Sequence, residues 1–135
     1  MQGIFNAIHT DSIGYAMDTA SAKNGVIAEN IANVDTPGYK AGKLEFGEAM
    51  AEYMGEGKKL PLSRTDDMHL PPKDEIMDPS SFIRKQNNPS LRNDGNDVNL
   101  DYEMSELAQN TVRYQELSLL SSHGFTKMKS AIQGR

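Results

Sequence analysis

The sequence predicts a mainly α-helical protein in which long N- and C-terminal helices pair as a coiled-coil-like hairpin. Near both ends of the 135-residue chain, apolar residues recur at alternating intervals of three and four, which is the helical pattern. The middle holds five of the six prolines and has no such period, so we expect it to be irregular and loop-rich, with room for short strands. This divides the chain into two parts of one helical assembly domain, at 1–40 and 97–135, and a middle segment at 41–96.

The first helix is predicted over residues 13–34. Its apolar or interfacial positions form a heptad seam: Ile13, Met17, Ala20, Asn24, Ile27, Ile31 and Val34. Alanines beside the seam would let a second helix approach closely, and Asn24 within it would fix the register of the pair. The same pattern also fits an amphipathic helix on an ordinary core, and periodicity alone leaves both possibilities open.

This helix is predicted to end at a turn over residues 36–39. Pro37 disfavours helical geometry at Thr36, the residue before it. Pro37 and Gly38 then suit the two central positions of a type II turn, which need a fixed φ and a positive φ. The chain must therefore change direction here.

Only weak signals of regular structure occur in the middle segment. Residues 46–54 favour a helical turn or two, and residues 81–85 favour a brief strand. The Asn-, Pro- and Gly-containing stretch 87–96 is typical of a mobile connection.

The second helix is predicted from Asn99, a good N-cap, to about Ile132. Asp101 and Glu103 would place negative charge at the positive end of the helix dipole. Gly124 costs about 1 kcal/mol relative to alanine within a helix, so the last turns have room to bend or fray. The apolar stripe of this helix is predicted to be Leu100, Met104, Leu107, Thr111, Tyr114, Ser118, Ser121, Phe125, Met128 and Ile132.

No catalytic, cofactor-binding or metal-binding constellation is expected. Cysteine is absent, and His9, His69 and His123 are far apart in sequence and lack a zinc-binding spacing. The net charge of −5 is spread along the chain, which argues against nucleic acid as a partner. No glycine-rich phosphate loop supports a small-molecule substrate. The sequence also lacks a secretory signal and a run of about 18 apolar residues, so we expect neither membrane insertion nor general secretion.

The end of the first helix resembles the N-terminal signature of flagellar axial proteins, which are the rod, hook and hook-associated subunits. The stretch that carries the resemblance is Asn30-Ile31-Ala32-Asn33-Val34-Asp35-Thr36-Pro37-Gly38-Tyr39-Lys40-Ala41. The chain is short, as the small proximal rod proteins are. Two types of proximal rod subunit can be compared with the chain, and it resembles the first type more, at residues 95–104, 113–115 and 125–132. The second type usually has a Pro-Asn-Val-Asp start and an Ala-Tyr-Gln core.

The resemblance implies a structural subunit that polymerises through its terminal helices into the proximal rod of the drive shaft that serves bacterial motility. It further implies export from the cytoplasm by the flagellar type III apparatus without a Sec signal, and ordering of the helices on assembly in the periplasm. The implied partners are other copies, other rod subunits, the adaptor between the rod and the MS ring, and the export apparatus.

Two groups of residues follow from this reading. Seven form the signature turn: Asn30, Ala32, Asn33, Thr36, Pro37, Gly38 and Tyr39. Nine are assigned to helix packing or assembly: Ile13, Met17, Ala20, Ile27, Ile31, Leu107, Tyr114, Leu117 and Phe125. The turn could be only a helix stop, or Tyr39 and Lys40 could also contact an adjoining subunit. A non-polymerising adaptor with coiled-coil ends remains the competing interpretation of the whole chain.

Overall fold

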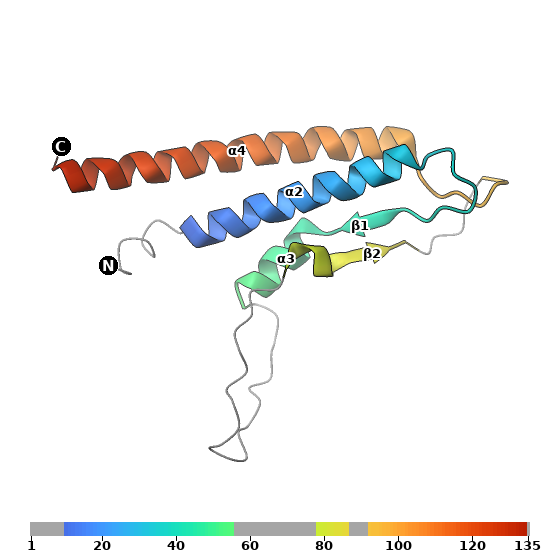
Figure 1. Cartoon of the computed structure of the whole chain (residues 1–135), viewed down its shortest axis with the longest axis horizontal. Helices are drawn as coiled ribbons and strands as arrows, with labels where there is room; N and C mark the ends of the chain where they lie inside the picture. The colour runs from blue at the N-terminus through green and yellow to red at the C-terminus, as the bar shows by residue number, and fades with distance from the viewer. Residues whose placement is uncertain (1–9, 56–77, 87–91, 135) are drawn as a thin grey trace, which may run out of the picture.

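A computed structural model of the chain describes residues 10–55, 78–86 and 92–134. Two long helices, α2 (Thr10–Ala32) and α4 (Leu100–Gln133), lie side by side and antiparallel (Figure 1). A short helix, α3 (Phe46–Tyr53), a 3₁₀ turn, η1 (Pro79–Phe82), and a two-stranded sheet lie against α2. The prediction of a mainly α fold with two long terminal helices and a loop-rich middle is confirmed.

Helix α2 packs on two sides at once. Ala20 and Ile27 are buried along the side that meets α4, while Val26 faces the sheet. The ring of Tyr15 stacks on that of Tyr53 in α3, with centroids 4.4 Å apart and planes 15° from parallel. Most of the buried apolar residues of the described chain are therefore contributed by α2.

The sheet consists of β1 (Gly42–Leu44) and β2 (Ile83–Lys85), paired antiparallel with Lys43 opposite Arg84. Leu44 is buried and anchors β1 in the core. A Cβ added at Gly42 would lie 3.1 Å from a Val26 methyl carbon, so glycine lets the strand approach α2 closely. The two turns of α3 confirm the predicted helical turns at 46–54. The strand predicted at 81–85 is confirmed for residues 83–85, whereas residues 81 and 82 belong to η1.

Helix α4 begins where the sequence predicts. The Asn99 side-chain oxygen accepts hydrogen bonds from the backbone N–H groups of Asp101 (3.1 Å) and Tyr102 (3.2 Å), so Asn99 is the N-cap. The helix is continuous through Gly124, which is buried, and it ends at Gly134 in the left-handed conformation. No helix in the described ranges is both long enough and apolar enough to cross a bilayer.

The face of α4 that meets α2 differs from the predicted apolar stripe. Its buried residues are Glu103, Asn110 and Gly124, whereas Met104 and Phe125 of the stripe are exposed. Each buried residue stands one position before a member of the stripe: Glu103 before Met104, Asn110 before Thr111 and Gly124 before Phe125. The reason is polar: the Asn110 side-chain amide donates to the Ala20 carbonyl (2.7 Å) and to the Asn24 side-chain oxygen (2.8 Å).

Candidate assembly interface

The turn after α2 has the predicted positive φ at Gly38. Gly38 has a φ of 70°, which glycine adopts without strain. The Thr36 N–H donates to the Asn33 carbonyl (3.0 Å), and the Tyr39 N–H donates to the Thr36 carbonyl (3.3 Å). Thr36, Pro37 and Gly38 are exposed, so the tip of the turn faces solvent in the single subunit.

Asn96 binds the end of α2 from the segment that precedes α4. Its side-chain amide donates to the carbonyls of Asn33 (2.9 Å), Val34 (3.1 Å) and Thr36 (2.8 Å), and its oxygen accepts from the Val98 N–H (2.8 Å). The side chain is completely buried. Carbonyls at a helix C-terminus lack helical partners. Asn96 gives three of them a buried donor in addition to the bonds that the turn and Arg92 supply. We call this set of bonds the Asn96 clasp.

Further bonds hold the same two segments together. The Gly38 N–H donates to the Asp94 carbonyl (2.9 Å), and the Ala41 N–H donates to an Asp97 carboxylate oxygen (2.7 Å). Gly95 also has a positive φ, and a Cβ there would lie 3.7 Å from the Gly38 Cα. The prediction of a mobile connection over 87–96 is therefore wrong for its described part, 92–96, because buried hydrogen bonds fix that part to the turn. Residues 87–91 lie outside the described residues.

Asn30 links the signature to the sheet. Its side chain donates to the Gly42 carbonyl and accepts from the Gly42 N–H, both at 2.8 Å, which is the pattern of a backbone strand partner. The Tyr39 hydroxyl donates to the same Asn30 oxygen at 3.4 Å. Burial raises the pKa of Tyr39, and the Glu29 carboxylate beside it raises the pKa further. Asn30 and Tyr39 thus make contacts within the subunit.

Glu103 is the buried charged residue of the contact between the long helices. Burial raises the pKa of its carboxyl, and a hydrogen bond with the Asn30 side chain acts in the opposite direction. Glu106 and Lys23 form an ion pair nearby, and their charges act on Glu103 with opposite signs. The polar contacts of α2 with α4 therefore include one titratable group whose neutral form the fold favours.

The residues assigned to packing or assembly occupy different environments. Ala20 and Ile27 are buried, and five others are half-buried: Ile13, Met17, Ile31, Leu107 and Leu117. Tyr114 and Phe125 are exposed, the latter by 59%. Met17 and Phe125 line a common groove of about 400 Å³ with hydroxyl-bearing residues and one cation: Ser118, Ser121, Ser122, Thr126 and Lys129. Because the structure holds one subunit, the assignment to assembly contacts stays a prediction. Of the two signature residues within α2, Asn30 is buried and Ala32 is exposed.

Sequence reasoning missed three polar residues that determine the geometry: Asn96, Glu103 and Asn110. Glu103 and Asn110 are seven residues apart, and Leu117 and Gly124 continue that interval. This second heptad line was present in the sequence, but its polar members gave it a weaker apolar signal than the neighbouring stripe.

The structure offers no centre for chemistry in the part of the chain that it describes. No group of three histidine, aspartate or glutamate side chains there is placed to hold a metal ion. His123 lies exposed on α4, whereas His9 and His69 lie outside the described residues. The carboxylates Glu45 and Glu48 form ion pairs with Lys43 and Arg84 on the surface.

Comparison with known proteins agrees with the fold and the signature turn. The family model described as "Flagella basal body rod protein" matches residues 14–40, which comprise most of α2 and the turn. Helix α2 and the turn that follows it therefore place the chain among structural proteins of the flagellar basal-body rod, and not among enzymes.

Curated relatives identify the family more narrowly. The chain is 36% identical over 119 residues to the flagellar basal body rod protein FlgB of Bacillus subtilis, covering 88% of each chain. It is 34% identical over 113 residues to FlgB of Escherichia coli, covering 78% of this chain and 80% of the relative. It is 32% identical over 126 residues to FlgB of Salmonella typhimurium, covering 88% of each. The chain belongs to the FlgB family, which confirms the resemblance found at residues 95–104.

Proposed function

We propose that this rod subunit polymerises through α2 and α4, and that other copies and other rod subunits cover the apolar surface these helices leave open. The observation that carries the proposal is the exposure of α4. Of its 34 residues, only Glu103, Asn110 and Gly124 are buried. A polar helix of that length gains little stability from its own subunit, because most helical stability in proteins comes from packing.

The unequal lengths of the two helices support the same proposal. At 1.5 Å per residue, α4 is about 51 Å long and α2 about 35 Å. Figure 1 shows α4 continuing past the start of α2. Ile132, near the projecting end of α4, is 78% exposed, and Phe125, which shares a groove with Met17 of α2, is 59% exposed. Contacts with a neighbour would remove this apolar surface from water.

Single apolar-to-charged substitutions test the role of the helix pair. Ile27 is 3% exposed and Leu117 is half-buried, so Ile27→Asp or Leu117→Asp would place an unpaired charge between the helices. We expect either variant to be produced normally and to abolish swimming. Ile83→Asp is the matched control, because Ile83 is 41% exposed on β2. Normal swimming of either helix variant would contradict the proposal.

We further propose that the subunit is exported without a Sec signal by the flagellar type III apparatus and orders its helices on joining the rod in the periplasm. Its partners would include the adaptor between the rod and the MS ring. Ordering that depends on a neighbour would prevent polymerisation in the cytoplasm. Hydrogen exchange on the dilute subunit tests this: α2 and α4 should exchange rapidly, and strong protection of both would contradict ordering on assembly.

The division into an assembly domain at 1–40 and 97–135 and a middle segment at 41–96 stays a prediction, as does the contact of Tyr39 and Lys40 with an adjoining subunit. The exposed tip at Thr36, Pro37 and Gly38 supports such a contact. Pro37→Ala should impair rod assembly more than it impairs folding of the subunit. Assembly of Pro37→Ala at the wild-type level would mean that the turn serves only to end the helix.

Sedimentation with purified basal bodies distinguishes the rod subunit from the competing adaptor. A rod subunit remains with the basal body through stringent washing, in more than one copy per particle. An adaptor that binds one target and does not polymerise would be washed away or would remain as a single copy. The readout is quantitative immunoblotting of the washed particles.

A further inference from the structure

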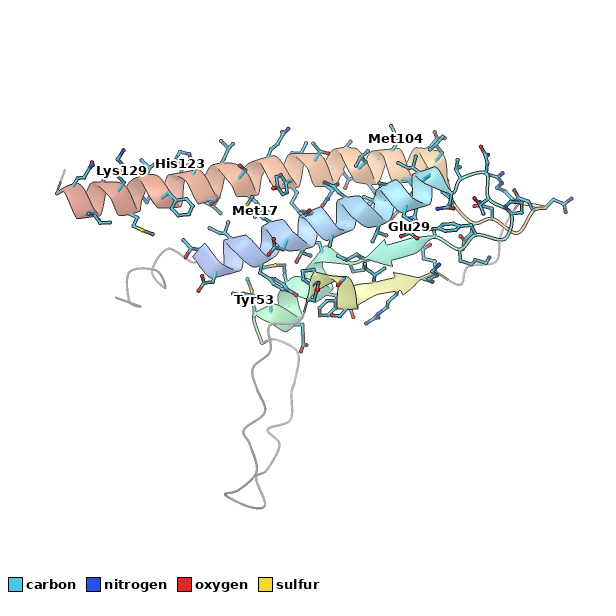
Figure 2. All side chains as sticks on the ribbon, in the orientation of Figure 1. Met17, Glu29, Tyr53, Met104, His123 and Lys129 are labelled. Atoms are coloured by element: carbon cyan, nitrogen blue, oxygen red, sulfur yellow. The ribbon has the colours of Figure 1, made fainter. Side chains whose placement is uncertain are left out.

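The sequence holds a single Asn-Gly pair, Asn24-Gly25, and it lies in the interior of α2. In Figure 2 the pair lies on α2 between the labelled residues Met17 and Glu29. Asparagine is a chemically labile residue. A glycine after it increases the lability, because the glycine backbone nitrogen can approach the asparagine side-chain carbon without hindrance from a Cβ.

Glycine at position 25 is not required by the packing of the described residues. A Cβ added at Gly25 would meet nothing within 4 Å. Inside a helix, glycine costs about 1 kcal/mol relative to alanine. Gly25 therefore weakens α2 slightly, contributes nothing to packing within the described subunit, and makes Asn24 reactive.

The fold holds the Asn24 side chain against α4. Asn24 is half-buried, and its side-chain oxygen accepts a hydrogen bond from the Asn110 side-chain amide at 2.8 Å. Asn110 is completely buried, and its amide also donates to the Ala20 carbonyl at 2.7 Å. The Asn24 amide is thus fixed by a residue that cannot turn away, and it stays fixed as long as α2 and α4 remain paired.

Helical geometry also keeps the two reacting atoms of the pair apart. An α-helix has a ψ of about −42°, whereas attack of the Gly25 nitrogen on the Asn24 side-chain carbon needs a more extended ψ at Asn24. Within α2 the Gly25 N–H donates to the carbonyl four residues earlier, so the nitrogen is not free to lose its proton. The ordered helix therefore suppresses the reaction, and the unordered chain permits it.

We infer that Asn24 is a site of spontaneous deamidation, and that pairing of α2 with α4 controls its rate. The Gly25 nitrogen loses its proton and bonds to the Asn24 Cγ. The bond from Cγ to Nδ2 breaks, and ammonia leaves as a succinimide ring closes. One water molecule then opens the ring at either of its two carbonyl carbons. Opening at the side-chain carbonyl carbon gives aspartate, and opening at the main-chain carbonyl carbon gives isoaspartate.

The two products differ in what they do to α2. Aspartate keeps the ordinary main chain and an oxygen that can accept from the Asn110 amide. Isoaspartate routes the main chain through the former side chain, which adds one methylene group and interrupts the helical hydrogen bonds around position 24. A subunit that stays unordered for long would therefore lose the ability to complete α2. This consequence for assembly rests on the proposed ordering of the helices in the rod, whereas the reactivity itself does not.

Peptide mapping of the full chain tests the inference. The chain is incubated at one mildly alkaline pH, either in guanidinium chloride or in trimethylamine N-oxide at a concentration where circular dichroism shows helix. Trypsin cleaves after lysine, so residues 24–40 form one peptide that also contains Asn30 and Asn33, each followed by a branched apolar residue. Mass spectrometry locates the converted residue, and a sample digested at time zero gives the background.

We expect conversion at Asn24 in guanidinium chloride, with little at Asn30 and Asn33 in the same peptide. In trimethylamine N-oxide the conversion should be at least about tenfold slower, because only the locally opened helix reacts. Equal rates at Asn24 in the two solutions would overturn control by the fold. Conversion of Asn30 or Asn33 as fast as that of Asn24 would overturn the assignment of the site.

Two glycine variants provide the matched comparison. Gly25→Ala should lose most of the conversion in guanidinium chloride. Gly14→Ala should convert like wild type, because Gly14 is also an α2 glycine with open space around it but follows Ile13. Gly25→Ala that converts at the wild-type rate would overturn the inference. None of these results bears on polymerisation, so their failure leaves the proposed function intact.

The consequence for α2 has its own readout. Wild-type chain aged in guanidinium chloride and then transferred to trimethylamine N-oxide should recover less helix than fresh chain, as measured by circular dichroism. Gly25→Ala aged in the same way should recover as much helix as its fresh sample. Full recovery of aged wild-type chain that contains isoaspartate would overturn the effect assigned to this product.

Discussion

Removing the buried Asn96 side chain should lower the free energy of unfolding of the subunit strongly. Asn96→Ala deletes two N–H donors that serve three carbonyls at the end of α2 and one acceptor that serves the Val98 N–H. The two donor hydrogens and the one acceptor count as three bonds. At roughly 0.5–1.5 kcal/mol net for each, their loss corresponds to about 1.5–4.5 kcal/mol, since complete burial limits replacement by water.

All stability measurements use the purified subunit in trimethylamine N-oxide, an osmolyte that favours burial and so orders the helices without a neighbour. Urea unfolding is followed by circular dichroism at about 222 nm, a wavelength that reports helix. Asn93→Ala is the matched control, because Asn93 is exposed in the same segment. Hydrogen exchange should also accelerate at the amide of Val98, which loses its acceptor, and at the amide of Gly38, which bonds across the two segments to Asp94. A loss below about 0.5 kcal/mol, or one equal to that of Asn93→Ala, would refute the role assigned to the Asn96 clasp.

Two further predictions concern a buried acid and two glycines. Because the folded-state pKa of Glu103 is raised, its stabilising contribution is complete below the ordinary glutamate pKa and is lost as pH rises through the raised value. Glu103→Gln should therefore be more stable than wild type near neutral pH, with the difference shrinking on acidification; equal pH dependence in urea titrations would contradict this. Gly38→Ala should cost about 1–2 kcal/mol because φ is 70°, whereas Gly25→Ala should stabilise α2 by about 0.5–1 kcal/mol, both measured by thermal unfolding. Effects of the same sign at the two glycines would show that backbone conformation does not distinguish them.

The end of α2 and the start of α4 were predictable because local chemistry sets them. Asn99 caps α4 by bonds to residues two and three positions further on, and Pro37 with Gly38 ends the helical path of α2. These signals lie within a few residues of the boundary they mark, so a single sequence contains them. The strand predicted at 81–85 is present at 83–85.

The face of α4 and the Asn96 clasp could not be predicted in the same way. Asn110 is buried because a carbonyl and a side-chain oxygen of α2, 90 and 86 residues earlier, accept from its amide. Asn96 stands 60 residues after Thr36, and only the folded chain brings the two together. Hydrophobic periodicity favours apolar positions, so it selected Phe125 over the buried Gly124 beside it.

The Asn96 clasp joins the two long helices at one end only, and this has a mechanical consequence. Thr10 and Gln133 lie at the opposite end of the helix pair, so tension applied there separates α2 from α4 by unzipping (Figure 1). In that geometry the load falls on one layer of side chains at a time, beginning far from the turn. The Asn24–Asn110 bond is reached midway, and the clasp bears tension last. When tension acts on the chain at Thr10, α2 and α4 therefore separate first, while the turn and the start of α4 stay joined.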